Sequence, residues 1–298
     1  MDVDLLDPGW KLNPTYPVFT EFEGVKGIFT GKGVDSANDY FSFHRPGSTD
    51  DGRTRANFLT NIQHLGRSNR FDPGKITMPN GTWPHSGHTI KAEEHQWVTN
   101  PKIDVLMPIT ADNQPITYDA IVTKSPEFIL AVQGADCPAI FFYDPDSRVI
   151  GLAHAGWKPL VRGVVRHTVD AMVELGAKME TIHAFTSPGS GDRYTLFQWD
   201  DSMEEEVRSV FVEAGRDDLL VDKSLRHEMT EEDRATLSRA LGRNVPQGNT
   251  FKISELAIRE LQSRGLLRSR ISQGTHSCLV DQYPNTAYCI LTMVERLK

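Results

Sequence analysis

The stretch that decides the fold runs from residue 127 to residue 157 and reads EFILAVQGADCPAIFFYDPDSRVIGLAHAGW. It contains three apolar runs, each short enough for a buried strand, separated by residues that are typical of turns. The last two runs, 139–143 and 149–153, flank Asp144-Pro145-Asp146-Ser147, and Asp followed by Pro suits a type I turn. These two runs therefore predict a β-hairpin.

The predicted hairpin places a cysteine next to a histidine. If Asp144 faces Ser147, the same register sets Cys137 opposite His154, and directly opposed residues have Cβ atoms about 4.5–5.5 Å apart. A thiolate and an imidazole at that separation could hold one metal ion or work as a nucleophile and its base. Asp136, next to the cysteine, could accept a proton from an imidazole and orient that ring.

Composition excludes several classes of protein. The net charge of −8 argues against general nucleic-acid binding, which needs a basic surface. No stretch approaches the roughly 18 apolar residues of a membrane helix, and the first residues lack the features of a signal peptide. Three cysteines do not make a disulfide framework. We therefore predict a reduced cytoplasmic protein without nucleic-acid or membrane partners, either a monomer or a homodimer.

The rest of the chain predicts strands and helices in alternation. The predicted strands are 25–30, 120–123, 128–132, 181–186, 270–280 and 287–293, and the predicted helices are 50–65, 160–175, 202–215, 230–242 and 253–264. Residues 66–116 are rich in Gly, Pro and Asn and predict a long loop. The pattern favours a single α/β or α+β domain with a mixed sheet over residues 24–298. Residues 1–23, with three prolines among aromatic residues, predict an arm on the surface.

A catalytic zinc site needs three protein ligands and an open fourth position. The hairpin offers only two, so the third ligand must come from elsewhere. His85, His88 and His95 are the nearest histidines in the sequence, and their spacing does not choose between them. The chain lacks a Walker loop, a dinucleotide fingerprint and the Pro-Cys-x-x-Cys signature of zinc nucleobase deaminases.

Two motifs resemble the laccase-domain family, long called multicopper polyphenol oxidases. These are Ala135-Asp136-Cys137-Pro138 and His154-Ala155-Gly156-Trp157. Pro84-His85-Ser86 resembles a third segment of the family, and this match selects His85 from the three histidines. Shorter matches to the family are Gly27-Ile28-Phe29-Thr30, the helix around Asn57, Thr89-Ile90 and Asp119-Ala120-Ile121-Val122-Thr123, so that the resemblance spans roughly residues 25–265.

The resemblance implies a layered α/β/β/α fold with a mixed sheet, similar to that of cytotoxic-necrotising-factor deamidases. It implies one zinc ion bound by His85, Cys137 and His154, and phosphorolysis of adenosine, inosine or guanosine, or deamination of adenosine. The older family name implies copper and phenols as the alternative, but a thiolate with two imidazoles suits zinc. The implied catalytic residues are His85, Asp136, Cys137 and His154.

The sequence departs from the family around the expected substrate pocket. Lys158-Pro159 stands where the family has Arg-Gly, and Ser187-Pro188 where it has Gly-Pro. Lysine keeps the charge but not the bidentate fork of arginine. The family's C-terminal Phe-Ser-Tyr-Arg-Arg is absent from residues 278–298. We expect Lys158 and Ser187 to contact the purine nucleoside or phosphate.

Two further interpretations stay open. Cys137 and His154 could form a metal-free cysteine hydrolase or amidase, as in the deamidases of similar fold, and some bacterial family members are linked to editing of peptidoglycan precursors. Alternatively, a zinc ion with four protein ligands would be structural, with Cys278 or His276 as the fourth ligand.

Overall fold

The computed structural model describes residues 15–30, 53–79, 85–134, 137–187, 198–199, 204–241, 244–245, 248–273 and 290–297. Asp136, His276, Cys278 and Cys289 lie outside these ranges, as do residues 1–14 of the predicted arm. No helix in the described ranges has the length and apolar character needed to cross a membrane.

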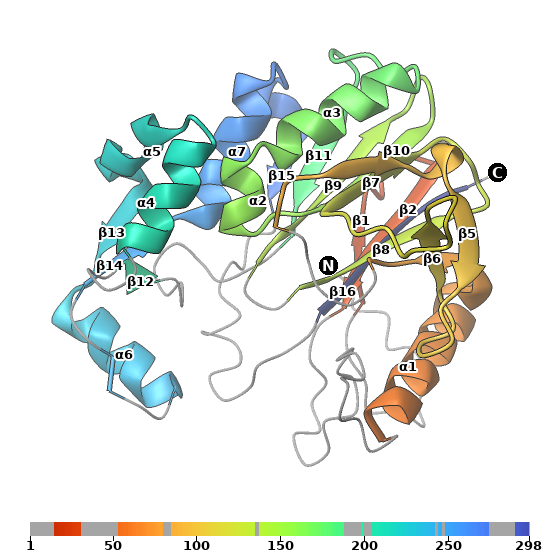
Figure 1. Cartoon of the computed structure of the whole chain (residues 1–298), viewed down its shortest axis with the longest axis horizontal. Coiled ribbons are helices and arrows are strands. Elements are labelled where there is room, and N and C mark those ends of the chain that lie inside the picture. Colours follow the sequence, from red (N-terminus) through yellow and green to blue (C-terminus); the bar gives the residue numbers. More distant parts are fainter. Residues whose placement is uncertain are drawn as a thin grey trace.

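Two mixed sheets form the body of the molecule (Figure 1). The strands of the seven-stranded sheet, in spatial order, are β1 (Thr15–Val18), β2 (Val25–Thr30), β16 (Ile290–Arg296), β8 (Ile129–Gly134), β3 (Ile76–Thr77), β6 (Leu106–Ile109) and β5 (Gln96–Thr99). Those of the six-stranded sheet are β15 (Ile271–Gln273), β11 (His183–Thr186), β9 (Ala139–Asp144), β10 (Val149–His154), β7 (Ala120–Thr123) and β4 (Thr89–Lys91).

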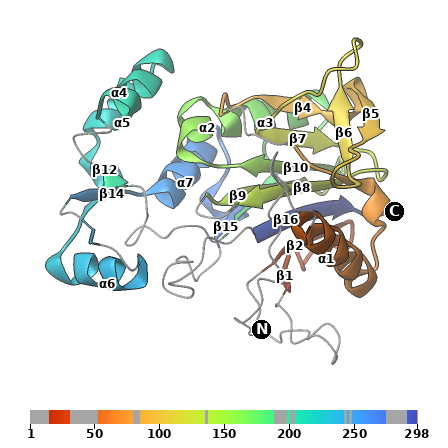
Figure 2. The same ribbon diagram turned by 60° about the horizontal axis from the view of Figure 1, so that its bottom comes forward.

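Helices cover the outer faces of both sheets. The α-helices are α1 (Arg53–Asn69), α2 (Trp157–Val161), α3 (Val164–Glu174), α4 (Glu204–Glu213), α5 (Asp217–Val221), α6 (Glu231–Leu241) and α7 (Ile253–Ser263), and the 3-10 turns are Pro73–Lys75, Ala92–Glu94, Lys223–Leu225 and Arg268–Arg270. A small sheet of β12 (Gln198–Trp199), β14 (Asn249–Phe251) and β13 (Arg226–Glu228) lies with α4, α5 and α6 at one end (Figure 2).

The central hairpin shows why the layers form. Along β9, Phe141 and Tyr143 pack into the apolar layer between the two sheets, whereas Ile140 and Phe142 pack under α3 and α7. Side chains alternate between the faces of a strand, so a strand covered on both sides needs an unbroken apolar run. On the far side, α1 buries Phe58 and Leu65 against the seven-stranded sheet. The predicted α/β/β/α layering is confirmed.

The predicted register of the hairpin is wrong by two residues. Asp144 pairs with Val149 rather than Ser147, and His154 pairs with Ala139 rather than Cys137. The turn is longer than assumed, because Asp144 ends the strand and its carboxylate accepts hydrogen bonds from the backbone N–H groups of Asp146 and Ser147. Four-residue loops built around a type I turn are common in hairpins. Cys137 therefore lies beyond the ladder.

Three other predictions need correction. Residues 15–18 of the predicted surface arm form an edge strand, and Val18 and Phe19 are buried between the sheets. The predicted loop 66–116 contains β3, β4, β5 and β6, which are too short for a clear period. The predicted helix 160–175 is divided into α2 and α3 at Gly163, whose φ of +87° lies outside the helical range.

Candidate metal centre

His154 is the buried member of the site. It ends β10, its side chain is only 4% exposed, and its backbone N–H donates to the Asp119 carbonyl at 2.8 Å. Burial, with a smaller effect of the neighbouring His85, lowers the pKa of His154 to about 3. The imidazole is therefore neutral at physiological pH, which is the form that binds metal ions.

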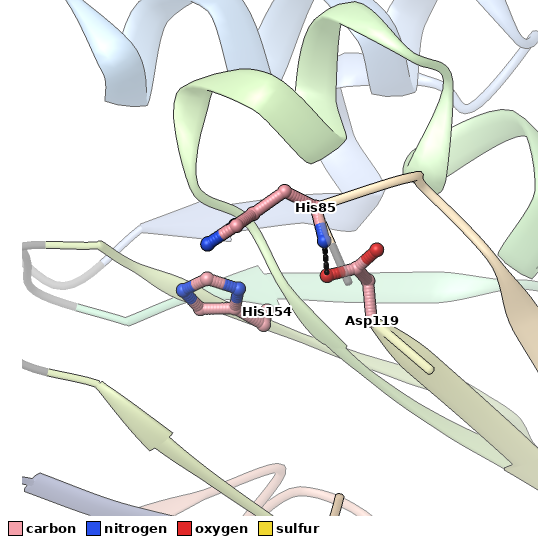
Figure 3. A group of neighbouring side chains, drawn as sticks. All are labelled: His85, Asp119 and His154. Carbon is pink, nitrogen blue, oxygen red and sulfur yellow. Dashed lines mark hydrogen bonds between the residues drawn. The ribbon is translucent and has the colours of Figure 1, made fainter. Parts of the chain in front are cut away.

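His85 approaches His154 from the loop before β4. Its side chain is exposed and its ring centroid lies 6.2 Å from that of His154, with an angle of 51° between the ring planes. The backbone of His85 has a φ of +53°. A positive φ is uncommon for residues other than glycine, so the surrounding contacts must hold this conformation. Figure 3 shows the two rings beside each other, with Asp119 next to the His85 backbone.

Asp119 lies below the loop that carries His85, directly before β7. Its fully buried carboxylate accepts backbone N–H groups of His85 at 3.2 Å, Ser86 at 2.9 Å and Gly87 at 2.8 Å. Burial raises the pKa of Asp119 above its usual value, although the backbone N–H donors and His85 oppose this shift. Three donors on one carboxylate tie the loop to the sheet.

The junction of α2 and α3 holds the same loop from the other side. Nη1 of Arg162 donates to the His85 carbonyl at 2.6 Å, and Nδ1 of His167 donates to the Gly87 carbonyl at 2.8 Å. Gly87 has a φ of +74°, and a Cβ at this position would lie 2.8 Å from the Arg162 carbonyl oxygen. Only glycine fits there without a shift of the backbone.

Cys137 and His154 both lie next to Gly156. A Cβ on Gly156 would lie 3.2 Å from the Cys137 sulfur and 3.5 Å from Nε2 of His154, so both atoms border the space that the glycine leaves. Cys137 is partly buried. The hairpin register does not oppose the two residues, but the chain entering β9 and the chain leaving β10 still bring them to one place.

Among the described residues, the group whose ligand atoms lie within 4.8 Å of one another consists of His85, Asp119 and His154. The structure brings His85 and His154 together, places Cys137 nearby, and adds Asp119, to which sequence reasoning assigned no role. Cys137 does not belong to this group, and neither do His88 and His95, the other two histidines of the sequence analysis. A buried strand that begins directly after an acidic residue was the available signal for Asp119, because a carboxylate is costly to bury without partners.

The two residues expected to contact substrate lie on different elements. Lys158 is the second residue of α2, and its Nζ lies 5.3 Å from the centroid of the Trp157 ring. Ser187 is 5% exposed, and its hydroxyl accepts the backbone N–H of Ala139 at 2.8 Å. Ser187 thus joins the end of β11 to the start of β9. Their contacts with substrate stay predictions.

The chain belongs to the family described as multi-copper polyphenol oxidoreductase laccase, whose model matches residues 26–283. It is 40% identical over 124 residues to a purine nucleoside phosphorylase of Deinococcus radiodurans, a match that covers 41% of this chain and 45% of the relative. It is 40% identical over 84 residues to the human purine nucleoside phosphorylase LACC1, covering 28% of this chain and 20% of the relative. The matched part thus spans less than half of each relative.

Solved structures agree over nearly the whole chain. The structure of Neisseria meningitidis protein NMB0706 superposes with a TM-score of 0.65 at 17% identity, covering 95% of this chain and 99% of the other. The hypothetical protein YfiH of Bacillus licheniformis gives 0.62 at 18% identity, covering 92% and 93%. At these identities the likeness concerns the fold.

The donor set at this site fits a metal ion. A tetrahedral zinc ion with Zn–N bonds of about 2.0–2.1 Å keeps its ligand atoms roughly 3.3 Å apart. The His85 and His154 nitrogens, within 4.8 Å of each other, approach that spacing. Two imidazoles suit zinc or copper rather than magnesium or calcium, which prefer oxygen ligands, whether the Asp119 carboxylate or the Cys137 thiol provides the third donor.

Proposed function

We propose that this protein is a zinc-dependent enzyme that acts on purine nucleosides, with phosphorolysis as its main reaction. The observation that carries the proposal is the approach of His85 to His154 within 4.8 Å, in a chain whose relatives are named purine nucleoside phosphorylases. The proposed zinc ligands are His85, Cys137 and His154. Three protein ligands leave a position for substrate, phosphate or water, as catalytic zinc sites require.

In phosphorolysis, a phosphate oxygen forms a bond to C1′ of the ribose while the bond from C1′ to the purine nitrogen breaks. The departing purine takes up negative charge, which a proton or a Lewis acid must neutralise. The zinc ion would supply Lewis acidity when bound. Asp136 is the proposed group that holds or moves a proton. Lys158 supplies the positive charge for phosphate at the start of α2.

The test combines metal analysis with turnover. Purified protein should contain about one zinc ion per chain, and should convert inosine to hypoxanthine and ribose 1-phosphate only when phosphate is present. A chelator should remove both the zinc and the activity, and added zinc should restore them. Adenosine is assayed in parallel, because release of inosine and ammonia without phosphate would identify deamination. Stoichiometric copper with phenol oxidation and no nucleoside turnover would favour the oxidase.

A second candidate is a cysteine amidase with Cys137 as nucleophile and His154 as base. The observation in its favour is that the Cys137 sulfur and Nε2 of His154 both border the space next to Gly156. The lowered pKa of His154 makes its imidazole a weak base at neutral pH and counts against this candidate. Inactivation by iodoacetamide that a chelator neither prevents nor mimics would favour the amidase. Protection of Cys137 from alkylation by bound zinc would favour the metal enzyme.

A further inference from the structure

Asp119 contacts both histidines of the site through different atoms. Its backbone carbonyl accepts the N–H of His154 at 2.8 Å, and its carboxylate accepts the N–H of His85 at 3.2 Å. The two histidines are 69 positions apart in the chain, so one residue provides a direct link between the strand that ends at His154 and the loop that carries His85.

The carboxylate of Asp119 is already used by the loop. Oδ1 accepts one backbone N–H, and Oδ2 accepts two, with the hydroxyl of Ser86 a further 3.5 Å contact. An ionised carboxylate offers about four lone-pair positions on its two oxygens. Three successive N–H groups that converge on one anion form a concave arrangement typical of anion binding by the backbone. The arrangement stabilises the left-handed conformation of His85.

We propose that Asp119 is a positioning residue that sets the direction of the His85 imidazole and does not itself bind the metal ion. The proposal rests on the proposed metal function of His85, Cys137 and His154. It differs from a ligand set of His85, Asp119 and His154, which the same 4.8 Å spacing would allow. Residues that hold a metal ligand in place typically change metal affinity by about 10–100-fold when mutated.

The contacts on the other face of the loop support this role. Arg162 and His167 hold the carbonyl groups of His85 and Gly87, while Asp119 holds their N–H groups. Both ends of the peptide dipoles are therefore satisfied, and the backbone beneath the His85 side chain has little freedom. Because this backbone is already ordered, binding of a metal ion by His85 costs little backbone entropy.

The experiment uses cobalt(II) as the probe in the full-length protein and in Asp119→Asn, which keeps the size of the side chain. Cobalt(II) bound to a thiolate gives a charge-transfer band in the ultraviolet, and its d–d bands report the ligand set. For Asp119→Asn we expect the dissociation constant to rise about 10–100-fold while the bands at saturation keep their positions. Hydrogen exchange of the peptide that contains residues 85–88 should become faster, with or without metal.

The matched control is Asp144→Asn. Asp144 is also fully buried and also accepts backbone N–H groups, but in the hairpin turn at residues 145–148. This variant should leave cobalt affinity and the exchange of residues 85–88 unchanged. A second variant, Arg162→Ala, weakens the loop from its exposed side and should raise the cobalt dissociation constant by a smaller factor. Glu213→Gln removes only the ion-pair partner of Arg162 and should leave the cobalt dissociation constant unchanged.

Several results would overturn the proposal. A shift of the d–d bands in Asp119→Asn would show that Asp119 is a ligand. The same conclusion would follow if Asp119→Asn lost cobalt as completely as His154→Ala while the hydrogen exchange of residues 85–88 stayed unchanged. An unchanged dissociation constant would remove any role in the site. If the unsubstituted protein bound cobalt but turned over no nucleoside, the proposed reaction would fail while the role of Asp119 stood. If it bound no cobalt, both would fail.

Discussion

Two turns next to the six-stranded sheet are each held by a buried aspartate. Asp119 holds residues 85–87, and Asp144 holds residues 145–148 between β9 and β10. Each turn contains a residue with positive φ that is not glycine, His85 at +53° and Arg148 at +58°. The local chemistry of the two turns is therefore similar, and only one of them carries a residue of the site.

The two carboxylates differ in the direction of their pKa shifts. Burial raises the pKa of Asp119, and the backbone donors do not offset it. Burial alone would also raise the pKa of Asp144, but donors from Ser147 and Thr181 and from the backbone bring it below its usual value. The hairpin turn thus stabilises the charge of Asp144, whereas burial in the site turn disfavours the charge of Asp119. Such a local cost is common at functional sites.

The largest effect is expected for His154→Ala. It removes the buried proposed ligand, so zinc content should fall to near zero and nucleoside turnover should fall by more than about 100-fold, beyond the range for residues that only support a ligand. His183→Ala is the control, because His183 lies in the same sheet but packs against Phe22. Equal zinc content in His154→Ala and the unsubstituted protein, measured by mass spectrometry, would refute the site.

Asp144→Asn should cause the larger loss of folding stability, whereas Asp119→Asn should cause the larger loss of zinc affinity. Asp144→Asn loses bonds to a well-stabilised charge and should lower the free energy of unfolding by about 1–3 kcal/mol. Asp119→Asn should lower it less, because its charge is poorly stabilised, yet only this variant should weaken zinc binding. Urea unfolding and zinc titration of both proteins provide the measurement. A parallel loss of stability and zinc affinity in both variants would remove the distinction between the turns.

The sequence predicts the centre of this molecule better than its edges. The long apolar runs of β8, β9 and β10 are recognisable because both faces of these strands are buried. The sequence predicts the hairpin but not its register, because a carboxylate that accepts backbone N–H groups lengthens a turn without changing its composition. β3 and β4 have two and three residues, too few for any period to appear.

The site was predictable in part. His85 entered through its resemblance to a family motif, since spacing alone left it equal to His88 and His95. The predicted register opposes Cys137 to His154, whereas His154 pairs with Ala139 and the two residues meet around Gly156. Asp119 was part of a matched motif but had no assigned role, because its partners are backbone atoms 32 to 34 residues away and no sequence pattern marks them.

A smaller effect is expected for Gly156→Ala. The added Cβ would lie 3.1 Å from Cε1 of His154 and 3.2 Å from the sulfur of Cys137, so the two proposed ligands must move apart slightly. The φ of Gly156 is −64°, which alanine adopts without strain. We expect weaker zinc binding, by roughly 10-fold as for other changes that displace a ligand, with little loss of stability. Gly176→Ala is the control with the opposite expectation. Gly176 has a φ of +103°, which strains alanine, and an added Cβ would meet no atom within 4 Å, so this variant should be less stable and should bind zinc with unchanged affinity.

The smallest expected effect is the pH dependence of the stability that Asp144 contributes. Because the pKa of Asp144 is lowered in the folded protein, its ionised form adds stability above the unfolded pKa of 3.8, and this is lost as the pH falls through the folded value. The difference in unfolding free energy between the unsubstituted protein and Asp144→Asn should therefore be constant above about pH 5 and shrink below about pH 4.

His183 needs its own control in this comparison. Burial and Arg270 lower the pKa of His183, whereas Glu21 and Asp144 raise it, so Asp144→Asn also changes how this histidine titrates. Repeating the series with His183→Gln in both proteins removes that contribution. A difference that stays constant down to pH 3 would mean that Asp144 holds its turn equally well when protonated. The contrast between the two aspartates would then reside in their positions and not in their charges.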